Sequence, residues 1–114
     1  MFMFGSGATT NHYSSMYYDL YTGAGTNTVR TNNTGKIYVA LNESGNTNSA
    51  FSIDVSNPFI TGPSHVYGNW AGRAYVGWSA GFNNLNTSFT SFTLCTDGAG
   101  TMTGGTIRVY GYRN

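Results

Sequence analysis

Four carboxylates, two histidines and one cysteine are the side chains of this sequence that acid–base, metal or nucleophilic chemistry would require. The carboxylates are Asp19, Glu43, Asp54 and Asp97. A hydrolase that uses a carboxylate pair needs one group as acid and the other as base or nucleophile, at a fixed separation. No spacing marks two of these four as such a pair, so we interpret them as solvated charges.

The histidines, His12 and His65, and the single Cys95 show none of the short spacings that are typical of metal sites. A Cys–His dyad would need a positioned base, and the residues around Cys95 supply none. We expect two surface histidines and a structural thiol within a strand. The sequence therefore predicts no catalytic residue, no metal site, no cofactor and no enzyme activity. One cysteine also excludes an intramolecular disulfide.

Charge is scarce in this chain, since 8% of its 114 residues are charged against about 25% in a typical domain. The five basic residues are scattered and the formal net charge is +1, which argues against nucleic-acid binding. No stretch approaches the roughly 20 apolar residues of a membrane span, and the first residues lack the pattern of a secretory signal. We expect a protein that is made in the cytoplasm and binds no membrane.

The elements that must position these side chains are strands, because apolar residues recur with a period of two and no amphipathic helix is apparent. Turn-forming residues separate the alternating segments. We expect an all-β, jelly-roll-like antiparallel β-sandwich of about eight short strands. The expected strands cover residues 14–21, 26–31, 36–42, 51–56, 64–70, 72–78, 87–96 and 105–113.

Alternation also predicts which side chains face the core of each strand. The predicted inward residues are Met16, Tyr18, Leu20, Ile37, Val39, Leu41, Phe51, Ile53, Val55, Val66, Trp70, Ala74, Val76, Trp78, Phe92, Leu94, Ile107 and Val109. Tyrosines fall on the opposite face, at Tyr13, Tyr17, Tyr21, Tyr38, Tyr75, Tyr110 and Tyr112. Tyrosine is enriched at interfaces, which favours a contact surface. Cross-strand pairing on a solvated face is the open alternative.

The chain divides into an N-terminal arm, residues 1–12, and a single β-sandwich domain, residues 13–114. The arm begins with four apolar residues, and we expect it to dock on a neighbouring subunit or another partner, the alternative being a frayed terminus. The predicted partner-binding residues are Met1, Phe2, Met3, Phe4, Tyr17, Tyr38, Tyr75, Tyr110 and Tyr112.

The last third of the chain carries a family resemblance. It reads Trp-Ala-Gly at residues 70–72, Gly-Trp at 77–78, Phe-Thr-Ser-Phe-Thr-Leu at 89–94 and Thr-Gly-Gly-Thr-Ile-Arg-Val-Tyr-Gly-Tyr at 103–112. This order resembles the Trp-bearing strand pair, the penultimate strand and the closing strand of small jelly-roll structural proteins of tailed bacteriophages. The segment 16–23 resembles an early strand of that group loosely. Phe89 and Phe92 depart from the group, in which Ile is commoner.

The resemblance implies a non-enzymatic virion protein, most simply a capsid decoration (cement) protein. Such a protein would be a homotrimer on the outer surface of the capsid, made in the host cytoplasm, and would bind the lattice of the major capsid protein. Symmetric repetition gives avidity to a modest interface, and few charges reduce its sensitivity to salt. The alternative is a tail-fibre or head-surface module that binds a receptor or host glycan. An enzyme acting on glycans is the least favoured of the three.

Overall fold

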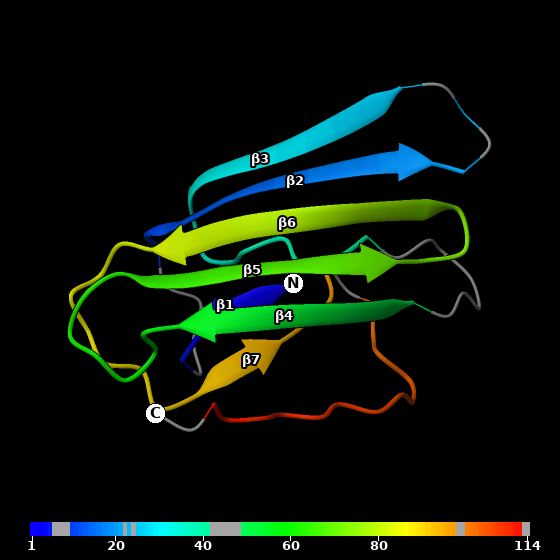
Figure 1. Ribbon diagram of the computed structural model, residues 1–114. Coiled ribbons are helices and arrows are strands. Elements are labelled where there is room, and N and C mark those ends of the chain that lie inside the picture. The colour runs from blue at the N-terminus through cyan, green and yellow to red at the C-terminus, as the bar shows by residue number, and fades with distance from the viewer. Residues whose placement is uncertain (6–9, 22, 24, 42–48, 98–99, 113–114) are drawn as a thin grey trace.

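The computed structural model describes residues 1–5, 10–21, 23, 25–41, 49–97 and 100–112, and these contain strands and no helix (Figure 1). The strands are β1 (Phe2–Phe4), β2 (His12–Leu20), β3 (Thr26–Thr34), β4 (Ala50–Ser56), β5 (Ser64–Ala71), β6 (Tyr75–Asn83) and β7 (Phe92–Leu94).

Two antiparallel sheets make up the fold. The larger sheet has the order β3-β2-β6-β5-β4, and the smaller consists of β1 paired with β7. Figure 1 shows the five long strands side by side, with β1 and β7 lying at an angle to them. The predicted all-β antiparallel sandwich is confirmed.

The core lies between the two sheets. It consists of Phe2, Phe4, Ile37, Val39, Val66 and Phe89, all nearly inaccessible to solvent. Phe2 and Phe4 come from β1 and Val66 from β5, so the core joins the smaller sheet to the larger one. Burial of such side chains stabilises the fold by roughly 1.5–3 kcal/mol each.

Three of the predicted strands take a different form. Residues 36–41 form no strand, although Ile37 and Val39 are buried as predicted; the backbone of Ile37 exchanges two 2.8 Å hydrogen bonds with that of Phe2. The strand expected over 87–96 shortens to β7. The described part of the segment expected over 105–113 forms no strand, and Ile107 and Val109 are 62% and 70% exposed rather than inward. That prediction was wrong, because a strand needs a partner as well as alternation.

The predicted orientation of β6 was also wrong. Val76 and Trp78 point outward and are 40% and 50% exposed, whereas Tyr75 points inward, where its ring meets that of Tyr18 edge-on. Small residues occupy the inward positions, at Gly77, Ser79 and Gly81. A Cβ at position 77 would lie 2.9 Å from the Trp70 ring, and one at position 81 would lie 2.7 Å from Ile37 Cγ2. Large inward neighbours therefore require small residues on β6.

The expected N-terminal arm does not lie free. Phe2, Met3 and Phe4 are 0%, 8% and 1% exposed, so their side chains are packed inside their own chain and are not available to a partner. β1 pairs with β7 in register, Phe2 opposite Leu94 and Phe4 opposite Phe92, and the backbone amide of Cys95 donates to the Met1 carbonyl at 3.0 Å. An apolar β-strand gains more from an available core than from solvent, so β1 belongs to the domain. Residues 6–9 of the expected arm lie outside the described residues.

The prediction that His12 is a surface residue was wrong as well. His12 is fully buried, and its Nε2 accepts the backbone N–H of Phe4 and the side-chain amide of Asn83, each at 3.3 Å. Buried polar groups are stable when hydrogen-bonded. His65, by contrast, is exposed as expected.

Candidate functional site

The face of the five-stranded sheet that points away from β1 and β7, here called the outer face, carries a row of rings. Alternation in β2, β5 and β6 sends every second side chain to this face. Six of these side chains form what we call the aromatic array: Tyr13, Tyr17, His65, Tyr67, Trp78 and Phe82.

Cross-strand register brings most of these rings together. Tyr17 lies opposite Trp78, with ring centroids 4.2 Å apart and planes nearly parallel. Tyr13 lies opposite Phe82 at 4.9 Å in the same stacked manner, and His65 extends this pair from β5 at 6.1 Å. Stacked rings in register hold one another in place, so the array is a preformed surface.

Exposure shows which rings of the array can meet a partner. Trp78 is 50% exposed and Tyr67 is 53% exposed. The other members of the array, apart from His65, are half-buried by their neighbours. The two most accessible large rings thus stand on the adjacent central strands β6 and β5.

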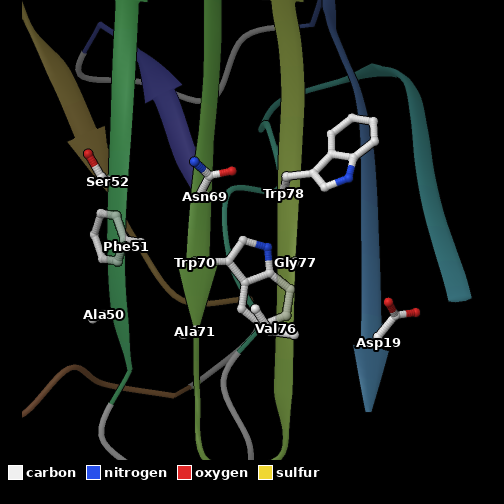
Figure 2. Close-up of a pocket in the computed structure, with 10 residues that line it drawn as sticks. All are labelled: Asp19, Ala50, Phe51, Ser52, Asn69, Trp70, Ala71, Val76, Gly77 and Trp78. Carbon is white, nitrogen blue, oxygen red and sulfur yellow. The ribbon is translucent and has the colours of Figure 1, made fainter. Parts of the chain in front are cut away.

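A shallow depression of about 680 Å³ adjoins the array at the end of the sheet where β4 begins (Figure 2). Figure 2 shows the Trp78 indole on one side of it and Ser52 and Asn69 across from the indole, with Asp19 on β2. A carboxylate, an amide and a hydroxyl beside an aromatic ring supply both hydrogen bonds and a stacking surface. These are the groups that orient a small polar ligand in a mostly apolar site.

Few charges lie near these groups. The nearby Ser15 hydroxyl and the guanidinium of Arg30 lower the pKa of the Tyr17 hydroxyl from its usual value. At the β4 edge, the hydroxyl of Tyr112 donates to Asp54 Oδ1 at 2.7 Å, and this bond raises the pKa of Tyr112. Charged side chains are therefore few on the outer face, which offers mainly rings and hydrogen-bonding groups.

The predicted partner-binding tyrosines do not form one surface. Tyr17 belongs to the aromatic array, whereas Tyr75 points inward. Tyr38 lies elsewhere, where its hydroxyl donates to Asp97 Oδ2 at 2.8 Å, a bond that raises its pKa. Tyr110 and Tyr112 are 79% and 84% exposed in a segment outside both sheets.

Sequence reasoning missed Trp78, Phe82 and Tyr67 as outer-face residues. The signal for Trp78 and Phe82 was the alternation of Gly77, Ser79 and Gly81, which marks the inward side of β6 by small size instead of by apolar bulk. For β5 the inward residues Val66 and Trp70 were predicted and are buried. Their neighbour Tyr67 was therefore predictable as outward.

Neither a metal-binding cluster nor a membrane-spanning helix is found among the residues that the structure describes. No group of three or more His, Cys, Asp or Glu residues is placed to hold a metal ion among residues 1–5, 10–21, 23, 25–41, 49–97 and 100–112. The same residues contain no helix that is long and apolar enough to cross a membrane.

Comparison with known proteins adds no assignment to this geometry. No protein-family model, no curated protein and no solved structure matches the chain.

Proposed function

We propose that this chain is a non-enzymatic structural protein of a tailed-phage virion, a capsid decoration protein whose outer face binds the lattice of the major capsid protein. One observation carries the proposal: a nearly neutral sheet face presents the aromatic array, with Trp78 and Tyr67 half-exposed at its centre. Aromatic residues are enriched and charges depleted at the centre of protein interfaces.

A lattice partner suits a face of this kind. The rings stand on a regular sheet and are fixed by stacking, so little conformational freedom is lost on contact. A repeating shell offers the same contact many times, and a homotrimer would add avidity. Under this proposal the contact is made by the outer face, and residues 1–4 serve the fold of the decoration protein itself.

The test is binding to phage heads that lack the protein, measured by co-sedimentation. Replacing Trp78 and Tyr67 by Ala is expected to weaken binding about 30-fold or more, as loss of a central aromatic contact does. The matched control is Phe59→Ala, which removes a ring that is 70% exposed in the β4–β5 connection and is expected to leave binding unchanged. Equal binding by all three proteins would contradict the outer-face assignment.

A receptor- or glycan-binding module is the second candidate, and the depression beside Trp78 favours it specifically. Asp19, Asn69 and Ser52 offer hydrogen bonds to hydroxyl groups while Trp78 offers a stacking surface. Quenching of Trp78 fluorescence by host-derived oligosaccharides, lost in Asn69→Ala, which keeps the Trp78 ring, would favour this candidate. Binding to heads without any saccharide response would favour the decoration protein.

A further inference from the structure

Residues 106–112, here called the Ile107 segment, have the sequence of a strand and no strand partner among the residues that the structure describes. Ile107, Val109, Tyr110 and Tyr112 are 62%, 70%, 79% and 84% exposed. No backbone hydrogen bond joins this segment to another described residue. Gly104 and Gly105, at φ of 91° and 110°, precede it in the left-handed region that favours glycine.

An open sheet edge with matching chemistry exists at β4. Within the described residues β4 pairs with β5 alone, so its outer edge offers unpaired backbone groups. Its inward residues Ile53 and Val55 pack against the core, and Phe51 remains 43% exposed. The apolar layer therefore continues up to this edge and stops there uncovered.

The other edge of the larger sheet is a poor match. The inward positions of β3 are Asn27, Val29 and Thr31, so polar side chains flank its one apolar residue. β4 also lacks the lysine or proline that commonly protects an edge strand from pairing. Of the two edges, β4 is the one suited to a further apolar strand.

The Ile107 segment and β4 have matching patterns of apolar residues, and their charges are of opposite sign. With Ile107 and Val109 turned toward the apolar side, Arg108 and Tyr110 turn toward the outer face, where β4 presents Asp54. Arg108 and Asp54 are opposite charges on the same side of such a pair. The 2.7 Å bond from Tyr112 to Asp54 agrees with this arrangement. Tyr112 is four residues after Arg108, so in a strand both side chains would lie on the outer face with Asp54.

We propose that the Ile107 segment adds as a strand to the β4 edge of a second copy of this chain. Within one chain the Tyr112 side chain bonds to Asp54 of β4, while Ile107 and Val109 are exposed to solvent. Among its described residues, each copy carries both a segment without strand pairing and an unpaired β4 edge, so the segment of one copy can pair with the edge of another in a symmetric assembly. This interface lies at the β4 edge and does not depend on the partner assigned to the outer face.

The first test is the oligomeric state of the full chain at micromolar concentration, measured by light scattering after gel filtration. The full chain is expected to be an oligomer, and Ile107→Asp with Val109→Asp to raise the dissociation constant about 100-fold or more, because buried apolar contacts are replaced by charges. The matched control is Phe59→Asp with Ile60→Asp, at residues 70% and 61% exposed, which should keep the mass of the oligomer. A monomeric full chain, or equal dissociation of both variants, would overturn the proposal.

A second test separates exchange between copies from closure within one chain. In a Cys95→Ser background, Ser52→Cys and Tyr110→Cys are introduced together, and isotope-labelled and unlabelled chains are mixed before oxidation. Disulfide-linked peptides that combine one labelled and one unlabelled partner are expected. If every linked pair carries a single label, the segment closes onto its own β4 and the proposal fails.

Discussion

At the scale of single residues, His12 shows how a polar side chain becomes part of an apolar core. Its Nε2 accepts from Phe4 of β1 and from Asn83 of β6, while Asn83 Oδ1 accepts the Leu85 amide at 2.9 Å. A neutral imidazole has one acceptor nitrogen, and here that nitrogen links three strands, β2 included. His12 thus fixes where β1 crosses the larger sheet.

We expect His12→Leu to lower the free energy of unfolding by roughly 2–4 kcal/mol, because it leaves two interior donors without this acceptor. Urea unfolding followed by tryptophan fluorescence measures the change. His65→Leu, on the exposed outer face, is the control and should shift the midpoint little. Equal losses in the two variants would show that the His12 hydrogen bonds contribute nothing specific.

Sequence alone could not identify this role. His12 is in phase with the inward residues Ser14 and Met16, but a histidine at the start of a strand is ordinarily a surface residue. The two groups that donate to its Nε2 belong to β1 and β6, and the β6 donor, Asn83, lies 71 positions away along the chain. Long-range pairing, rather than local pattern, decides burial at this position.

At the scale of elements, β6 depends on small residues at the middle of its inward side, at Gly77, Ser79 and Gly81. A Cβ at Gly81 would meet Ile37 Cγ2 at 2.7 Å and the Tyr13 carbonyl oxygen at 2.8 Å. Both neighbours belong to packed elements that cannot withdraw without disturbing the core.

Gly81→Ala is therefore expected to lower stability by about 1–3 kcal/mol, the usual cost of overpacking. The matched control is Gly72→Ala, where the nearest atom to a Cβ lies at 3.6 Å and the change should stay within about 0.5 kcal/mol. Thermal unfolding followed by circular dichroism compares the two variants. A stable Gly81→Ala protein would mean that Ile37 can move aside.

Strands with apolar inward residues were predictable, and strands defined by their partners were not. The alternation of Met16 in β2 and of Val66 in β5 gave the correct faces, since these residues are buried. For β6 the same rule predicts Trp78 as a core residue, because it treats large apolar side chains as inward, and here they lie on the outer face. Residues 106–112 alternate just as well but form no strand, because none of the described strands pairs with them.

At the scale of the whole molecule, three residues of β1 hold the smaller sheet against the larger one. The Phe4 ring lies 5.1 Å from that of Phe89 and 5.0 Å from that of Phe2. A domain of this size has only about 5–15 kcal/mol of net stability. A single ring at this junction is a large part of that total.

Phe4→Ala should cost roughly 3–5 kcal/mol of unfolding free energy, as expected for loss of a buried phenyl ring. Phe92→Ala removes a ring that is 41% exposed from the paired strand and should cost clearly less. Chemical denaturation of both variants gives the comparison. If Phe4→Ala folds as stably as the unsubstituted chain yet loses partner binding, residues 1–4 form a docking arm after all.

Because the inward residues of β6 are small, the two faces of this strand are under different structural constraints. The residues at positions 77, 79 and 81 are set by packing in the interior, whereas those at 76, 78, 80 and 82 contact only neighbours on the outer face, such as the rings that stack on Trp78 and Phe82. Exchanging the second set would change the surface of the outer face, stacked rings included, and leave the packing of the interior unchanged. β6 is thus a natural site for a display library, in which new targets are selected on an unchanged scaffold.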